Sequence, residues 1–250
     1  MAGHSHSSNI AARKGAVDKK RSNAFSKLSR NIMSAVKQGG PDPDANFKLR
    51  YAIEKARAGN MPKENIERVI KKSAADKSDS MEELNYEGYA PGGVALIITC
   101  LTDNRHRTAP DIKYAFERGG GNLGSPGSVG FLFSYKTLVV AERGERSEDE
   151  WLELGLECGA EDVKLEGDVV SITAPATDFL PVKKALEDRE VAMLSAEMGY
   201  VPGTLVAITD KDEARRVLKL IDTLEDNDDV QNVYANYDIP AEWIAELAGS

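Results

Sequence analysis

Basic side chains are concentrated at the start of the chain, where their number and spacing suit contact with a polyanion. Residues 1–40 contain eight Lys and Arg but a single acidic residue, Asp18. Lys and Arg bind nucleic acids mainly through the phosphate oxygens. A solvated helix face and a targeting peptide are the alternatives. The residues expected to contact phosphates in this segment are Arg13, Lys14, Lys19, Lys20, Arg21, Lys27 and Arg30.

A second pair of cations, Arg105 and Arg107, lies in the segment Asp103–Arg107, where a predicted strand ends and a predicted helix begins. The first backbone N–H groups of a helix have no partner within the helix, so phosphate binds favourably there. We therefore add both arginines to the predicted nucleic-acid-binding residues. A solvated turn is the alternative interpretation of this segment.

Other motifs point away from catalysis and cofactors. Gly119–Gly124 matches the spacing of a dinucleotide-binding loop, but it follows a predicted helix and precedes a predicted strand, the reverse of that motif's context. We interpret it as a tight glycine turn. Glu225–Asp229 lacks the spacing of a calcium-binding loop and is expected to be an acidic, solvated turn.

Metal and catalytic sites have little support elsewhere in the chain. Cys100 and Cys158 show no metal-ligand spacing. Ala2–His4 could offer four nitrogens to Cu(II) or Ni(II) once Met1 is removed, which we interpret as incidental. No group of nucleophile, base and orienting residue is visible. We expect no enzyme activity, no cofactor and no metal, with a metabolic enzyme as the alternative class.

The net charge of −9 hides two segments of opposite sign. Residues 1–80 contain 17 Lys and Arg against 8 Asp and Glu, whereas residues 81–250 contain 15 against 33. A basic segment joined to an acidic body indicates a polyanion partner for the first part. The acidic body then serves solubility or contacts a protein partner.

Composition and apolar runs exclude several classes of protein. The chain has 250 residues, of which 41% are hydrophobic and 29% charged, as in an ordinary globular protein. The longest apolar run, Val94–Ile98, is far shorter than the ~18 residues of a membrane span, and no secretory signal opens the chain. We expect a cytoplasmic monomer without a membrane partner.

Apolar spacing predicts a helical beginning. Apolar residues recur every three or four positions through about residue 38, which indicates one helix face. Gly39–Asp44 ends this helix, a second is predicted from Asp44 to Ala58, and a third includes Ile66–Ile70. The polar segment Ser73–Glu83 is the predicted linker.

Beyond the linker, short β-rich runs alternate with amphipathic helices, one of which is predicted to be capped by Thr108. The predicted strands are 94–101, 128–133, 137–141, 162–165, 169–173, 192–198, 204–208 and 230–235, and the predicted helices are 108–118, 147–158, 179–189 and 211–224.

The order of these elements predicts an α+β fold with an N-terminal three-helix domain followed by two ferredoxin-like domains, the third inserted into the second. The boundaries are 1–80 for the basic helical domain, 81–133 plus 204–250 for the central domain, and 134–203 for the inserted domain. This nesting avoids a long structureless loop. One large mixed sheet is the alternative.

Several short motifs, spread through nearly the whole chain, resemble those of the YebC/PmpR family. The matching residues are Met1–Ser5, Asn9, Ile10, Arg13, Lys14, Asp18, Lys20, Arg21, Phe25, Lys27, Leu28, Arg30, Tyr86–Tyr89, Pro91–Ala95, Leu101–Arg105, Arg107, Thr108, Gly120–Gly124, Gly127–Val129, Asp228–Gln231, Val233, Tyr234 and Asn236. The resemblance implies three domains with a helical N-terminal bundle and no enzymatic activity. Members carry the description of DNA-binding transcriptional regulators, and others, including a mitochondrial translational activator of cytochrome c oxidase, are linked to ribosomes and to translation of difficult sequences.

The sequence departs from the family pattern near its start. His6–Ser8 and Ala11–Ala12 stand where relatives usually carry two cations and a tryptophan. Phosphate contact is therefore assigned to the later basic residues. The resulting hypothesis is a non-enzymatic, nucleic-acid-binding regulator of gene expression, with DNA or ribosomal RNA as partner. The alternative is a ribosome-associated translation factor that binds ribosomal RNA.

Overall fold

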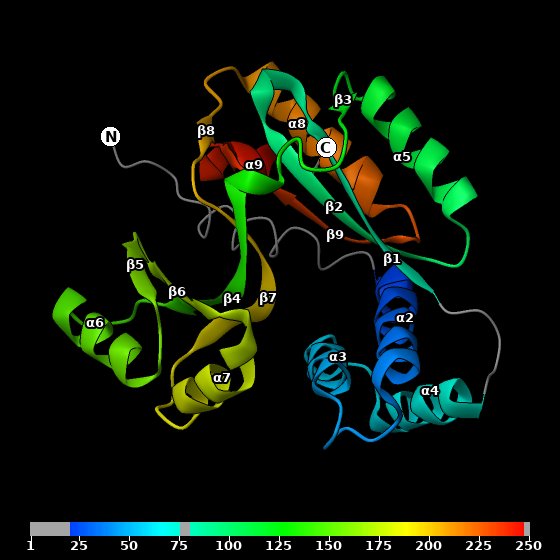
Figure 1. Cartoon of the computed structure of the whole chain (residues 1–250). Coiled ribbons are helices and arrows are strands. Elements are labelled where there is room, and N and C mark those ends of the chain that lie inside the picture. Colours follow the sequence, from blue (N-terminus) through cyan, green and yellow to red (C-terminus); the bar gives the residue numbers. More distant parts are fainter. Residues whose placement is uncertain (1–20, 76–80, 248–250) are drawn as a thin grey trace.

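The computed structural model describes residues 21–75 and 81–247, and its elements form three groups (Figure 1). Three helices come first, and two separate four-stranded sheets follow, each covered by helices. The predicted α+β class, with N-terminal helices before sheet domains, is confirmed. Within the described residues, no helix is long and apolar enough to cross a membrane.

The N-terminal helices are α2 (Arg21–Gly39), α3 (Phe47–Ala58) and α4 (Lys63–Ala75). Asn46 joins the first two. Its side-chain oxygen accepts a hydrogen bond from the Leu49 backbone N–H at 3.1 Å, and its amide nitrogen donates to the carbonyls of Ala35 and Gly40 at 2.8 Å each. The N-cap of α3 thereby also satisfies carbonyl groups at the end of α2. Their shared core consists of Leu28, Ile32, Ala35, Val36, Leu49, Ala52, Ile53, Ala56, Met61 and Ile66.

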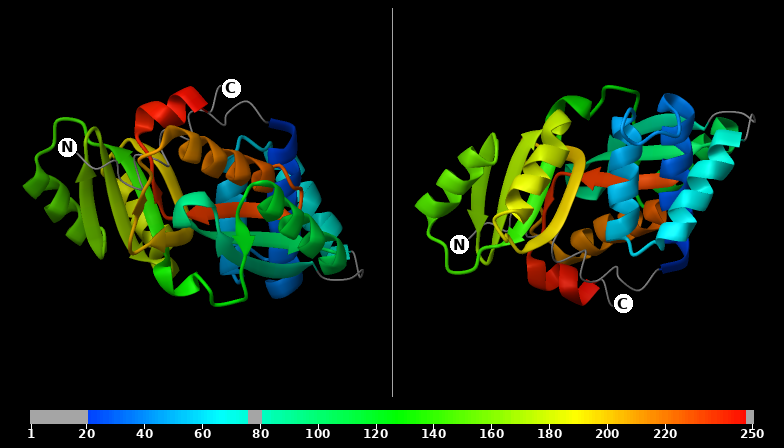
Figure 2. Two further views of the ribbon diagram at one scale, coloured as in Figure 1. Left: turned by 90° about the horizontal axis from the view of Figure 1, so that it is seen from above. Right: turned by 90° about the horizontal axis from the view of Figure 1, so that it is seen from below.

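The central sheet has the strand order β3-β1-β2-β9, with every pair antiparallel. Its strands are β1 (Glu82–Tyr89), β2 (Ala95–Thr102), β3 (Asn122–Leu123) and β9 (Val230–Ala235). Helices α5 (Arg105–Arg118) and α8 (Lys211–Glu225) bury their apolar faces on one side of this sheet. Figure 2 shows α2, α3 and α4 on the opposite side, so the central sheet lies between two helical layers.

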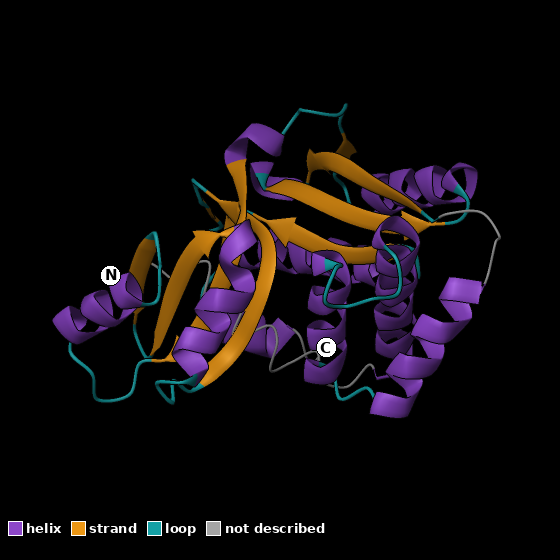
Figure 3. Cartoon of the chain, turned by 60° about the horizontal axis from the view of Figure 1, so that its bottom comes forward, coloured by secondary structure: helices purple, strands orange, loops and turns teal. Residues whose placement is uncertain are grey.

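The second sheet has the order β5-β6-β4-β7, also antiparallel (Figure 3). Its core surrounds Trp151, which is fully buried. Its elements in chain order are β4 (Phe133–Glu142), α6 (Glu148–Glu157), β5 (Asp162–Glu166), β6 (Val169–Pro175), α7 (Phe179–Glu187) and β7 (Met193–Pro202).

Short elements complete the described chain. Strands β8 (Val206–Ala207) and β10 (Tyr237–Asp238) form a small parallel pair, and α9 (Ala241–Leu247) places Ile244 in the central core. The single-turn helices are η1 (Pro91–Gly93), η2 (Gly130–Leu132) and η3 (Ala176–Asp178).

Of the strands predicted for the central part, 128–133 was wrong and 204–208 is a short strand outside the main sheet, and one further strand was missed. Residues 130–132 form η2, and 206–207 pair with β10 outside the main sheet. The strand β1, which occupies part of the predicted linker and the residues after it, was missed. It pairs with β2 along its full length from Glu82 to Tyr89 and lies between β3 and β2 in the sheet. The inserted domain thus has the predicted β-α-β-β-α-β order of a ferredoxin-like domain, whereas the central domain runs β-β-α-β-α-β, so the ferredoxin-like prediction for the central domain was wrong.

The helix after β2 also begins earlier than predicted. Asn104, rather than Thr108, caps it, since the Asn104 side chain accepts from the N–H groups of His106 and Arg107 at 3.1 and 3.2 Å. Gly120 has a positive φ of 73°, and a Cβ on Gly121 would lie 2.6 Å from the Tyr89 carbonyl oxygen. The glycine-rich segment is thus a tight turn, as expected.

We predict that residues 133–203, expressed alone, fold into the inserted domain. All four strands of the second sheet and a separate apolar core lie within this segment. Because Trp151 is the fragment's single tryptophan, its buried ring should give blue-shifted fluorescence and report cooperative thermal unfolding. The Leu186→Asp variant, which places a charge in the core, should abolish both the blue-shifted fluorescence and the cooperative thermal transition. Solvent-exposed tryptophan emission from the parent fragment would contradict the predicted domain boundaries.

Candidate nucleic-acid interface

A buried carboxylate, that of Asp229, joins three parts of the chain just before β9. Only 4% of its side chain is exposed. It accepts hydrogen bonds from Thr102 at 3.2 Å and Thr108 at 2.8 Å, and it forms ion pairs with Arg107 at 2.9 Å and Arg30 at 3.0 Å. Burial by itself raises the pKa of Asp229, but the bonds from Arg107 and Thr108 outweigh burial and lower that pKa below its usual value.

The neighbouring carbonyl groups extend this contact to α2. The Lys27 ammonium donates to the Glu225 carbonyl oxygen at 2.6 Å, and Arg30 donates to the Asp228 carbonyl oxygen at 2.5 Å. These carbonyls lie at and just after the C-terminal end of α8, where cations interact favourably with the helix dipole. The acidic segment 225–229 therefore fastens the N-terminal helices to the central sheet. The prediction of a wholly solvated turn was wrong, because Asp229 is buried.

The structure separates the sequence-predicted phosphate ligands into distinct groups. Lys27, Arg30 and Arg107 contact the segment before β9, whereas Arg105 is exposed at the first position of α5. The side chain of Arg21 and the whole of Arg13, Lys14, Lys19 and Lys20 lie outside the described residues. Phosphate contact by any of these nine residues stays a prediction.

Exposed cations that the sequence analysis did not single out occur on α4. Arg68, Lys71 and Lys72 are exposed at spacings of three and four residues, which places them near one another on the helix surface. Among the described residues none of the three has a carboxylate partner, and Arg68 donates only to the side-chain oxygen of Asn65 at 2.8 Å. Residues 21–75 contain twelve Lys and Arg against five Asp and Glu. The spacing of Arg68, Lys71 and Lys72 is visible in the sequence and could have identified them as a group of neighbouring cations.

A pocket of about 490 Å³, partly open to solvent, lies where the three parts of the molecule meet. Helices α2 and α3 form one wall, the central sheet forms the second, and β4, η3 and β7 form the third. Tyr51 and Glu54 of α3 link the first wall to the third. The Tyr51 hydroxyl accepts from the Met198 N–H at 2.9 Å, and Glu54 pairs with Lys183 at 3.0 Å. This pocket could not be predicted from the sequence, because its walls come from distant segments.

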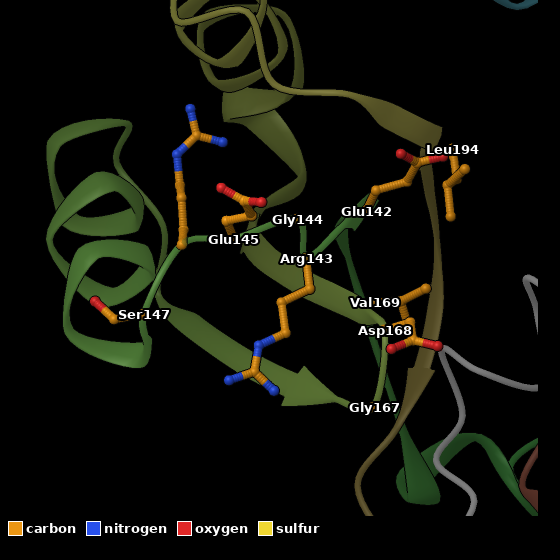
Figure 4. Close-up of a pocket in the computed structure, with 10 residues that line it drawn as sticks. Glu142, Arg143, Gly144, Glu145, Ser147, Gly167, Asp168, Val169 and Leu194 are labelled. Atoms are coloured by element: carbon orange, nitrogen blue, oxygen red, sulfur yellow. The ribbon is translucent and has the colours of Figure 1, made fainter.

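Figure 4 shows a second depression, of about 770 Å³, at the end of the inserted sheet. It lies between the segment 142–147, the turn Gly167–Asp168 and Leu194 of β7. The side chains of Glu142 and Arg143 point in different directions, so its charged groups do not converge on one point. This arrangement resembles a solvated surface hollow more than a binding site.

These features define a class of protein with three parts: a basic layer of three helices fastened to an acidic body of two α+β domains. Models of the TACO1/YebC N-terminal domain and of the TACO1/YebC second and third domain match residues 5–76 and 81–237. The chain belongs to the TACO1/YebC family, as its motifs indicated.

Proteins and a solved structure from several bacteria are similar over nearly the whole chain. Proteins from Syntrophobacter fumaroxidans and Rubrobacter xylanophilus, each described as a probable transcriptional regulatory protein, are both 47% identical, covering 99% and 100% of this chain and 100% of their own length. The crystal structure of a conserved hypothetical protein from Aquifex aeolicus is 45% identical, with a TM-score of 0.78 over 90% of this chain and 93% of that chain.

We predict that Asp229→Asn lowers the free energy of unfolding by about 2 kcal/mol at neutral pH, since hydrogen bonds to a charged group contribute ~1.5–3 kcal/mol. Because the folded state lowers the pKa of Asp229, its contribution is complete above the usual Asp pKa of ~3.9 and is lost as pH falls through the lowered value. Urea unfolding of both proteins from pH 7 to pH 2.5 should show this difference shrinking. A constant difference would contradict a role for the charge.

The two arginines at the start of α5 should behave differently when replaced. Arg107→Ala is expected to lower the urea midpoint, because it removes a partner of buried Asp229, while Arg105→Ala should leave the midpoint unchanged. Nucleic-acid affinity should fall for Arg105→Ala at unchanged stability. Equal stability of the two variants would show that the Arg107 pair contributes nothing to the fold.

Proposed function

We propose that this protein is a non-enzymatic, cytoplasmic regulator of gene expression that binds the phosphate backbone of nucleic acid through its N-terminal helices. The observation that carries this proposal is the set of exposed cations Arg68, Lys71 and Lys72 on α4, which lack carboxylate partners among the described residues. The similar proteins described as probable transcriptional regulatory proteins support a regulatory role.

The ion pairs at Asp229 refine the set of phosphate ligands. A cation that already contacts a buried carboxylate has less freedom to exchange that partner for a phosphate, because the buried charge would then be left uncompensated. We therefore assign Arg30 and Arg107 to compensating Asp229, and Lys27, which donates to the Glu225 carbonyl, to holding α2 against the end of α8. The proposed phosphate ligands are therefore the cations of α4, Arg105 and the basic residues that precede α2.

The charge of the rest of the molecule supports this assignment. Residues 81–250 carry 33 acidic against 15 basic side chains, and this surplus repels a polyanion. A nucleic acid is therefore directed to the helical side of the molecule. Phosphate contacts do not distinguish promoter DNA from ribosomal RNA, so the experiment uses both.

The test is the salt dependence of binding to a DNA duplex and to an RNA. If Arg68, Lys71 and Lys72 each contact one phosphate, replacing all three by Ala should reduce the log–log salt slope by about 2.7 on duplex DNA and about 2.1 on a single strand. The matched control replaces the exposed Lys113, Lys164 and Lys219 of the acidic body by Ala.

The control variant should keep the salt slope of the parent protein, because it removes no cation on the helical side, and its affinity should fall only slightly as the acidic body becomes more negative. Equal slopes for the α4 variant and the parent would refute phosphate contact by α4. Tight, salt-sensitive binding to ribosomal RNA together with weak binding to DNA would favour the translation factor over the transcriptional regulator.

A further inference from the structure

An amide without a hydrogen-bond partner lies in the wall of the pocket between the three parts. Both polar atoms of Gln231, Oε1 and Nε2, are buried, and neither has a partner among the described residues. An amide that has lost water without gaining a partner costs about 1–3 kcal/mol. Such a group is usually explained by strain, a missing water or a functional role.

The backbone places Gln231 at this point. Thr99 of β2 pairs with Asn232, while the next residue, Cys100, pairs with Val230, which leaves Gln231 as the additional residue of a β-bulge. A β-bulge interrupts the alternation of side chains between the two faces of the sheet, and bulges are frequent beside binding sites. Consequently Gln231 and its neighbour Asn232 both line the pocket, although adjacent residues of a regular strand point to opposite faces.

Aromatic rings lie in the same pocket. Tyr135, Tyr200 and Tyr234 form a row with ring centroids 5.1 and 5.4 Å apart, each pair edge to face. The ring of Tyr135 is half exposed, at 49%. Exposed tyrosine rings offer faces on which a flat ligand can stack.

Two lysines add positive charge to the wall formed by α3. Lys55 donates to the Asn232 side-chain oxygen at 3.1 Å, and Lys48, 59% exposed, lies 3.6 Å from Glu83. Lys48 also donates to the Gln38 side-chain oxygen at 2.5 Å, and its largely exposed ammonium has room to contact a phosphate at the surface as well.

These groups together select the chemistry of the ligand. An apolar ligand would leave the Gln231 amide unpaired, and a simple anion would not use the tyrosines. A nucleobase offers a flat face together with an edge of donors and acceptors, which Gln side chains bind in known complexes. The volume of about 490 Å³ lies within the ~300–1,000 Å³ range of small-molecule sites.

We propose that this pocket receives one unstacked nucleobase of a single-stranded nucleic acid, with Gln231 bonded to the edge of the base and a tyrosine against its face. Binding requires the Gln231 side chain to turn toward the pocket, and the new hydrogen bonds repay that movement. The inference rests on the proposed function, because the basic helices hold the backbone of the same strand. Because only a single strand offers an unstacked base, the pocket adds a preference for single strands over duplexes to the phosphate contacts.

The experiment compares two ten-nucleotide single strands at one salt concentration, one of deoxyadenosine and one with every base removed. Phosphate contacts are the same in both, whereas only the first can fill the pocket. Stacking and edge contacts of a single base should make the base-containing strand bind about tenfold more tightly. Both strands should show the same salt slope.

Gln231→Met tests the amide with a side chain of similar shape. The variant should retain or increase the melting temperature, because an unpaired buried amide is replaced by an apolar group. Its affinity for the deoxyadenosine strand should fall toward that of the abasic strand, because the edge contacts are lost while stacking on the tyrosine remains, and its affinity for the abasic strand should not change. Asn122→Leu, an exposed amide on β3 outside the pocket lining, is the control and should keep the preference for bases.

The outcomes separate this inference from the proposed function. Equal binding of both strands with a steep salt slope would overturn the base pocket while leaving phosphate binding intact. Absence of salt-dependent binding to either strand would overturn both. An excess of adenosine monophosphate that removes the tenfold preference, with no effect from ribose 5-phosphate, would confirm that the pocket recognises a base. If the protein bound free adenosine monophosphate more tightly than the strand, the natural ligand of the pocket would be a free nucleotide, and the proposal that the base belongs to a strand would be overturned.

Discussion

The buried carboxylate of Asp229 is the interaction on which the arrangement of the molecule depends. A charge that is 96% removed from solvent is tolerated only when cations and hydrogen-bond donors surround it. Its donors come from the end of β2, the start of α5 and the middle of α2. Satisfying one carboxylate therefore fixes the helical layer against the central sheet, and the face of the sheet beneath that layer becomes a wall of the pocket.

A second, weaker set of contacts holds the helical layer to the inserted domain. The ring of Tyr51 lies edge to face with Phe179 at 4.9 Å, and Glu54 pairs with Lys183, whose side chain is 22% exposed. Partly exposed ion pairs contribute little to stability. The contacts of α3 with the inserted domain are thus weaker than those of α2 with the segment before β9.

The sequence predicted most of the helices and the inserted sheet, because their apolar residues recur at regular spacing and their ends carry caps such as Ser147. Strand β1 was missed because its residues, from Glu82 to Tyr89, include charged and glycine residues and only one is buried. Its place comes from pairing with the apolar strand β2 and not from its own pattern. The Asp229 pairs were equally inaccessible, since Arg30 and Asp229 are 199 positions apart, and charge counts cannot show which cations are already paired.

The Gln231 bulge and the Asp229 cluster are consequences of the same short segment. Asp229 must enter the core to meet Arg107, while Asn232 and Tyr234 must face the helical layer, so the strand between them changes register. An additional residue is the least disruptive means of making that change, because it leaves the pairing on both sides intact. The additional residue need not have been polar for this purpose, and an apolar side chain would have avoided the cost of an unpaired amide. The presence of Gln at this position is therefore not explained by the fold, and a ligand that pairs with the amide supplies the missing reason.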